Sequence, residues 1–160
     1  MGEYEGRTAA SGRRFAIVIS RFNANVTDRL LAGARACLEE HGARDSDVDT
    51  FSVPGAWELP VAALHAARSG YDAVIAIGCV IRGDTPHFDY VAGGAAQGLA
   101  DVSVQTGVPV VFGVLTTESL EQALDRAGGK SGNKGWEAAL TALEMADLIG
   151  LMGEQSASKK

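Results

Sequence analysis

Four short apolar stretches rich in β-branched residues stand out along the chain, at positions 15–20, 48–53, 73–81 and 108–115. The first, third and fourth are apolar at consecutive positions rather than at alternate ones. Runs of this kind are typical of strands that are covered on both faces, as in a parallel sheet. The pattern therefore predicts four parallel strands that lie between layers of helices.

Segments with helical periodicity separate these stretches. After the first strand, the apolar residues Val26, Leu30, Ala34 and Leu38 recur four positions apart, His41 follows at i+3, and Gly42 follows as a stop. Three further segments end in the same way, near Gly70, Gly107 and the pair Gly128–Gly129. The last segment, from position 134, carries a rough stripe of Trp136, Leu140, Leu143 and Leu148.

The resulting order β-α-β-α-β-α-β-α-α predicts a three-layer αβα sandwich around a four-stranded parallel sheet, with right-handed crossovers. The 160 residues fit one domain, and no internal repeat or linker interrupts positions 1–160. Residues 1–12 are too polar to pack well alone. We expect this N-terminal arm to be disordered or to pair with a neighbouring subunit, and residues 154–160 to form a frayed tail.

Charge and cysteine content narrow the class of protein. The formal net charge of −6 argues against nucleic acid or an anionic membrane as the main partner. Cys37 and Cys79 are far apart and form no CxxC pair, which fits a reducing compartment without a structural metal cluster. No run approaches the ~20 apolar residues of a membrane span, and positions 1–14 lack the apolar core of a signal peptide. We expect a cytoplasmic protein.

Ligands of parallel α/β sheets bind outside the carboxyl ends of the strands. The candidate chemistry therefore lies in the segments at residues 20–23, 54–58, 79–85 and 115–117, each of which contains polar, glycine or aromatic residues.

The third of these segments leads into the densest cluster, from Arg82 to His87. Gly83 frees the backbone, Thr85 is a candidate N-cap, and Pro86 suits the first helical position. The unpaired N–H groups at a helix start suit an anion, typically phosphate. His87 would face the same site, where an imidazole can move protons near neutral pH. The spacing alone fits an ordinary capped helix with a solvated histidine about as well.

The other candidates each have a structural alternative. Phe22 could stack on a planar heterocycle or pack against its own helix. Glu58, in the first turn of the next helix, could accept hydrogen bonds from substrate hydroxyls or simply favour the helix dipole. The glycine-rich segment with Arg126, Lys130 and Lys134 could supply a phosphate ligand or form a helix end and a chain reversal. The chain lacks the GxGxxG, GxxxxGK[ST] and GxSxG motifs, and its histidines lack metal-site spacing.

Taken together, the motifs resemble those of the 6,7-dimethyl-8-ribityllumazine synthases of riboflavin biosynthesis. The most specific are "VPGAWELP", "VIRGDTPHFDYV", "FGVLTTESLEQALDRAG" and "GNKG", and the resemblance covers nearly the whole chain. It implies a flavodoxin-like fold and a condensation that needs no cofactor. 5-Amino-6-(D-ribitylamino)uracil reacts with 3,4-dihydroxy-2-butanone 4-phosphate, and the products are the lumazine, inorganic phosphate and water.

The resemblance also assigns roles to residues. It implies that the pyrimidine substrate is bound by Phe22, which stacks on its ring, by Ala56, Trp57 and Glu58 in the ribityl pocket, and by backbone groups of Cys79, Val80 and Ile81. The phosphate would be held by Gly83, Asp84, Thr85 and Arg126. His87 would transfer protons. Phe112 and Lys134 would reach the pyrimidine from an adjacent subunit, because the sites of this family lie at subunit interfaces.

Two residues depart from the family pattern. Asp84 is acidic beside a phosphate site, so we expect its side chain to point away and only its backbone to contribute. Trp57 replaces a smaller apolar residue. The family implies a homopentamer, and the short segment "GGKSGNKG" resembles the members that assemble further into an icosahedral shell. Riboflavin synthase is the further partner that the resemblance suggests.

Three rival functions are compatible with this fold. A flavodoxin-like flavin-binding module would be redox-active. A riboflavin synthase of the small single-domain type would disproportionate two lumazines without a phosphate substrate. A purely structural shell protein would not need histidine, arginine and lysine to converge at the strand ends.

Overall fold

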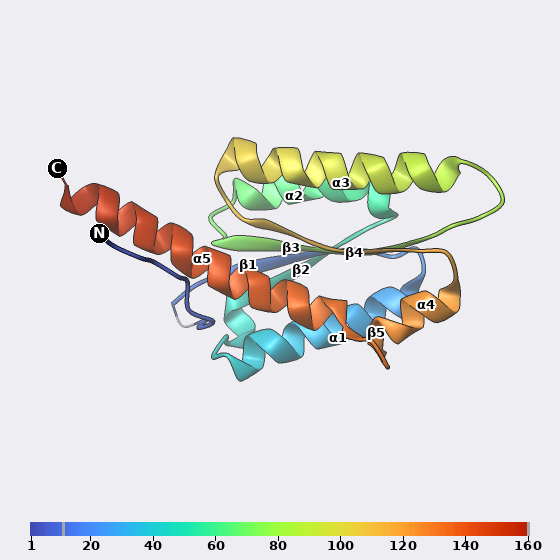
Figure 1. The fold of residues 1–160 in the computed structure, drawn as a ribbon, viewed down its shortest axis with the longest axis horizontal. Coiled ribbons are helices and arrows are strands. Elements are labelled where there is room, and N and C mark those ends of the chain that lie inside the picture. Colours follow the sequence, from blue (N-terminus) through green and yellow to red (C-terminus); the bar gives the residue numbers. More distant parts are fainter. Residues whose placement is uncertain (11, 160) are drawn as a thin grey trace.

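The computed structural model describes residues 1–10 and 12–159 and contains the predicted parallel sheet. Its strands are β1 (Phe15–Ser20), β2 (Val48–Val53), β3 (Ala73–Ile81) and β4 (Val110–Thr117), in the order β2-β1-β3-β4 (Figure 1). The first three bounds match the prediction. The fourth strand starts two residues later, because Pro109 has no N–H to donate to the ladder, and it continues to Thr117, which pairs with Ile81.

Two helices cover each face of this sheet. The helices α1 (Ala24–Glu40) and α5 (Lys134–Ser158) lie on one face, and α2 (Leu59–Ala67) and α3 (His87–Thr106) lie on the other (Figure 1). Successive side chains of a strand point to opposite faces, so Ile17 packs in the α1–α5 core while Val18 packs in the α2–α3 core. This double coverage explains why β1 is buried at every position.

The connections between the layers include five short elements. Single 3₁₀ turns, η1 (Asp45–Asp47) and η2 (Ala56–Glu58), flank β2. After β4, the short helix α4 (Leu120–Asp125) leads into a hairpin of β5 (Ala127–Gly129) and β6 (Gly132–Asn133). The helix end and the chain reversal that the sequence allows for this glycine-rich segment are both present, and the reversal takes the form of this hairpin. The predicted stops are confirmed at Gly42 and Gly107, which adopt positive φ angles of 100° and 70°.

The stripe predicted for the last helix is confirmed in part. Leu143 is buried, and Trp136 and Leu140 are half-buried and pack against the core, whereas Leu148 is half-buried outside it. The fully buried face of α5 consists mainly of small residues: Gly135, Ala138, Ala139, Ala142, Leu143 and Ala146. The reason is the close approach of α5 to α1. A Cβ atom at Gly135 would lie 1.9 Å from the carbonyl oxygen of Leu30, so no larger side chain fits between the two helices there.

The N-terminal arm lies beside α5 (Figure 1). The Arg7 N–H donates to the Asp147 carboxylate at 2.7 Å, and the buried Ala10 donates from its N–H to the His41 carbonyl at 3.0 Å. At the other end, α5 continues to Ser158, so residues 154–158, which we expected to fray, are helical. Ser11 in the arm and Lys160 in the tail lie outside the described residues.

Candidate active site

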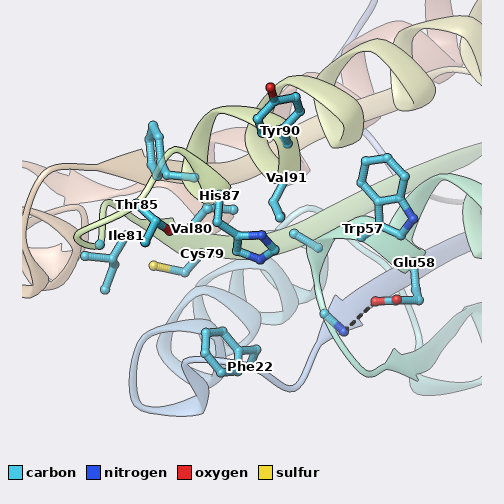
Figure 2. Close-up of a pocket in the computed structure, with 14 residues that line it drawn as sticks. Phe22, Trp57, Glu58, Cys79, Val80, Ile81, Thr85, His87, Tyr90 and Val91 are labelled. Carbon is cyan, nitrogen blue, oxygen red and sulfur yellow. Dashed lines mark hydrogen bonds between the residues drawn. The ribbon is translucent and has the colours of Figure 1, made fainter.

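A cleft of about 700 Å³ opens at the carboxyl edge of the sheet. Its volume is typical of sites for small molecules. Residues after β1, β2 and β3 line it, which places it where the strand order reverses between β1 and β3. Ten predicted site residues contribute to the lining: Phe22, Ala56, Trp57, Glu58, Cys79, Val80, Ile81, Gly83, Thr85 and His87 (Figure 2).

Phe22 projects into the cleft from the turn between β1 and α1. Backbone hydrogen bonds tie this turn to the end of β2, from Arg21 to the Val53 carbonyl at 2.8 Å and from Phe22 to the Pro54 carbonyl at 3.2 Å. The next residue, Asn23, has a positive φ of 62°, and its Nδ2 donates to the Cys79 carbonyl at 2.8 Å. The turn that carries Phe22 is therefore bonded to the ends of β2 and β3, while Phe22 itself remains 71% exposed.

Glu58 and Trp57 come from the 3₁₀ turn after β2. Glu58 ends this turn, directly before α2, rather than lying in the first turn of that helix as predicted. One carboxylate oxygen, Oε2, accepts the Gly55 N–H at 3.0 Å and so closes the turn (Figure 2). Trp57 is 61% exposed, and its indole ring packs against α3 at Gly94. A Cβ atom added at Gly94 would lie 2.3 Å from this ring. Trp57 thus both packs on α3 and lines the cleft.

The end of β3 contributes backbone and a buried thiol. Val80 and Ile81 line the cleft beside Cys79, whose carbonyl already accepts the Asn23 amide. Burial raises the pKa of the Cys79 thiol to about 11, so this sulfur is protonated at neutral pH. A protonated thiol is a poor nucleophile, and Cys79 therefore serves as a lining group rather than as an activated one.

The segment from Gly83 to His87 leads from β3 into α3. The helix begins at His87, its N-cap position is Pro86, and no side chain caps it, so Thr85 is not the N-cap that we predicted. Pro86 (φ −64°, ψ −3°) occupies the N-cap position instead, so the helix starts at His87, one residue later than predicted. Gly83 and Thr85 line the cleft, whereas the exposed Asp84 between them does not. His87 is exposed and lines the cleft from the first turn.

Arg82 fastens this helix start to the end of β4. Its Nε lies 2.9 Å from Glu118 and its guanidinium 3.4 Å from Asp89, and it also stacks 4.4 Å from the centre of the Phe88 ring. The hydrogen bond to Glu118 and the two nearby carboxylates raise the pKa of Arg82. The guanidinium is thus engaged in contacts within the chain, and Arg82 does not line the cleft.

Four lining residues were not predicted from the sequence: Gly55, Phe88, Tyr90 and Val91. Tyr90 and Val91 follow His87 by three and four positions, the spacing that places side chains on one face of a helix. That spacing was the signal available in the sequence. Figure 2 shows the Tyr90 hydroxyl directed away from the His87 ring, so in this structure the tyrosine contributes an aromatic wall.

Four of the predicted site residues do not line the cleft of their own chain. Asp84 is one; the others are Phe112, Arg126 and Lys134. Phe112 is 46% exposed on β4, an edge strand of the sheet. The Arg126 guanidinium donates to the Gln122 carbonyl at 3.0 Å, and the Lys134 ammonium lies 3.4 Å from Glu137.

Within residues 1–10 and 12–159, no three His, Cys, Asp or Glu side chains gather as a metal site would require. None of the described helices combines the length and apolarity needed to cross a membrane.

The strand order matches the first four strands of the flavodoxin-like order 2-1-3-4-5, and the cleft lies at its switch point. A mainly apolar cleft with one imidazole and one carboxylate at this position is typical of a small α/β enzyme that acts on small molecules.

Comparison with known proteins identifies the family. The model of the 6,7-dimethyl-8-ribityllumazine synthase family matches residues 12–150. The 6,7-dimethyl-8-ribityllumazine synthase of Aquifex aeolicus (strain VF5) is 56% identical over 147 residues, which cover 91% of this chain and 96% of that protein. The chain belongs to the 6,7-dimethyl-8-ribityllumazine synthase family.

Proposed function

We propose that this protein condenses 5-amino-6-(D-ribitylamino)uracil with 3,4-dihydroxy-2-butanone 4-phosphate. The products are 6,7-dimethyl-8-ribityllumazine, inorganic phosphate and water, which makes the protein a transferase of riboflavin biosynthesis. The observation that carries this proposal is the 56% identity to a protein of that name, over nearly all of both chains. The cleft supports it, because Phe22, Glu58 and His87 meet there from three different connections.

The pyrimidine substrate suits the side of the cleft between Phe22 and Trp57. The exposed Phe22 ring is free to stack on the heterocycle, and Ala56, Trp57 and Glu58 would surround the ribityl chain. With Glu58 Oε2 bonded to Gly55, the other carboxylate oxygen is the one that would accept a ribityl hydroxyl. Backbone groups of Cys79, Val80 and Ile81 would bind the uracil edge, with Val80 and Ile81 contributing most since the Cys79 carbonyl already has a partner.

The phosphate of the second substrate suits the other side of the cleft, at Gly83 and Thr85. These residues precede a helix start that no side chain caps, so backbone N–H groups there can donate to phosphate oxygens. Asp84 would contribute only its backbone, since its side chain does not line the cleft. Arg126 would supply the cationic charge that helps phosphate to leave.

His87 would move the protons of the reaction. The amine attacks the ketone, a Schiff base forms, phosphate departs, and the ring closes with loss of water. Each step transfers a proton, and His87 lies in the first turn of α3 between the proposed phosphate and pyrimidine positions. Holding the two substrates together in one cleft would supply much of the rate, so no cofactor is proposed.

A second copy of the chain would complete the site. Phe112, Arg126 and Lys134 do not line the cleft of their own chain, so if they serve a cleft it is that of a neighbour. Large apolar side chains on the cleft rim also remain exposed, with Phe22 at 71% and Tyr90 at 74%. We propose a cytoplasmic homopentamer that assembles further into an icosahedral shell, with riboflavin synthase as a further partner. Sedimentation velocity tests this: a pentamer without larger species would refute the shell, and a monomer would refute both.

Incubation with both substrates tests the activity. We expect lumazine absorbance and inorganic phosphate to appear together, in equal amounts, and only when both substrates are present. Incubation with the lumazine alone distinguishes the proposed activity from that of a riboflavin synthase, the main rival. Riboflavin formed from the lumazine without phosphate release would identify a riboflavin synthase, and no product in either assay would refute the proposed activity.

A further inference from the structure

The Asn133 side chain, which does not line the cleft, connects the hairpin, the start of α5 and α1. Its Oδ1 accepts the N–H groups of Gly135 at 2.8 Å and Trp136 at 3.1 Å, which caps the start of α5. Its Nδ2 donates to the carbonyl of Arg29 on α1 at 3.1 Å. A helix cap needs only the acceptor oxygen. The second bond, made by the amide nitrogen, instead fastens the hairpin and the start of α5 to α1.

Two glycines make room for this attachment. A Cβ atom at Gly33 of α1 would lie 2.4 Å from Asn133 Oδ1, so the carboxamide rests directly on the backbone of that helix. The backbone at Gly135 contacts the Leu30 carbonyl without any side chain between them. The hairpin and the first turn of α5, residues 126–136, form a corner of the subunit. Its position relative to α1 is therefore set by backbone contacts and by one side-chain hydrogen bond.

The same corner carries the two cations proposed for the neighbouring site. Arg126 directly precedes β5 and Lys134 directly follows β6, so both flank the hairpin. The Lys134 N–H donates to the Arg126 carbonyl at 2.8 Å, which holds the two backbone positions together. Asn133 lies between them in β6 and pairs with Ala127 of β5. Any shift of Asn133 relative to α1 would move both cations as a unit.

We propose that Asn133 is a positioning residue for Arg126 and Lys134. Its Nδ2 bond to α1 sets where the two cations stand relative to the rest of the subunit, and therefore where they meet a phosphate-bearing substrate. This inference rests on the proposed function, in which Arg126 serves the phosphate. It assigns Lys134, whose backbone N–H is bonded to the Arg126 carbonyl, to that same phosphate-bearing substrate rather than to the pyrimidine. Charge placed to within a fraction of an ångström stabilises a phosphate more than the same charge on a loose corner.

The test separates the cap from the attachment with two substitutions. Asn133→Ser keeps a good capping oxygen but loses the amide donor. Gly33→Ala leaves Asn133 intact but pushes its carboxamide off α1. For both variants we expect the KM for 3,4-dihydroxy-2-butanone 4-phosphate and the Kd for inorganic phosphate to rise roughly three- to tenfold, the size of one lost neutral hydrogen bond. The KM for the pyrimidine substrate should stay within about twofold.

Two further variants serve as controls. Gln97→Ala removes an exposed hydrogen bond to Asp101 on α3 and should change none of these constants. Asn133→Ala loses the cap as well. If Asn133→Ala impairs the enzyme while Asn133→Ser and Gly33→Ala leave the KM for the phosphate substrate unchanged, Asn133 is only a cap and the inference is overturned. A parallel rise in both KM values with a lowered Tm would also overturn it, because that indicates general loosening.

Arg126→Ala distinguishes failure of this inference from failure of the proposed function. If Arg126→Ala leaves phosphate binding unchanged, the proposed role of Arg126 fails and the inference fails with it. If Arg126→Ala weakens phosphate binding while Asn133→Ser does not, the function stands and only the positioning role is refuted.

Discussion

The contact between α1 and α5 gives the sharpest prediction from the structure, because one helix contains two glycines in opposite environments. Gly135 lies at the start of α5, where an added Cβ would be 1.9 Å from the Leu30 carbonyl oxygen. Gly153 lies in the same helix with nothing within 4 Å of its added Cβ. The same substitution, glycine to alanine, should therefore have opposite effects at the two positions.

The magnitudes follow from packing and helix propensity. Gly135→Ala would force two backbones apart by more than about 1 Å, and overpacking of this kind costs about 1–3 kcal/mol. Alanine in place of glycine gains up to about 1 kcal/mol in a helix interior, and less at the second position of a helix. Gly135→Ala should thus destabilise the protein by about 1–2 kcal/mol or more, whereas Gly153→Ala should stabilise it by about 0.5–1 kcal/mol.

Chemical and thermal unfolding of both variants would measure the difference. For a chain of this size, 1 kcal/mol corresponds to a Tm shift of roughly 2–4 °C, so we expect Gly135→Ala to lower Tm and Gly153→Ala to raise it by a few degrees. Protein concentration must be held constant, since assembly makes apparent stability depend on it. Two variants that are equally stabilised would refute the close packing of α5 on α1.

Three further predictions concern the cleft and the two buried thiols. His87→Ala should lower kcat by about 10² or more while both KM values change little, and a kcat within twofold of the unsubstituted enzyme would rule out the acid–base role. Gly94→Ala places a Cβ 2.3 Å from the Trp57 ring. Because that ring is 61% exposed and can move, stability should change little while the KM for the pyrimidine rises severalfold; an unchanged KM would show that Trp57 does not contact the substrate. Burial raises the pKa of the Cys79 and Cys37 thiols to about 11, so their alkylation at pH 8 should be much slower in the folded than in the unfolded protein. Unfolded thiols ionise first as the pH rises from about 9 towards 11, so stability should fall over that range, and a Tm that is constant there would contradict the raised pKa.

The two central strands, β1 and β3, were predictable because burial on both faces leaves them apolar at nearly every position. The bounds of β1, β2 and β3 agree with the predicted stretches, although β2 is a partly exposed edge strand with polar residues among its β-branched ones. The end of β4 was not predictable in the same way. Its last residues, through Thr117, are held by pairing with Ile81, a contact between segments more than thirty positions apart.

The candidate site was also predictable from the sequence only in part. Strand ends of a parallel sheet meet at one edge, so Phe22, Glu58 and His87 could be assigned to one cleft without coordinates. The local errors came from competing short-range geometry. Pro86 rather than Thr85 holds the N-cap position of α3, and Glu58 closes its own 3₁₀ turn before α2 begins. A sequence pattern cannot rank such alternatives, because each satisfies the same local rules.

By itself, the sequence determined the class of fold, the edge of the sheet that bears the chemistry and the family to which the chain belongs. These depend on periodicity and on motifs that are local along the chain. Only the tertiary structure decided which face of α5 is buried and how the corner at Asn133 meets α1. Both depend on the distance between two helix backbones, which is set by the absence of a side chain at Gly33 and Gly135. A glycine in a sequence does not reveal which distant backbone takes the place of its missing Cβ.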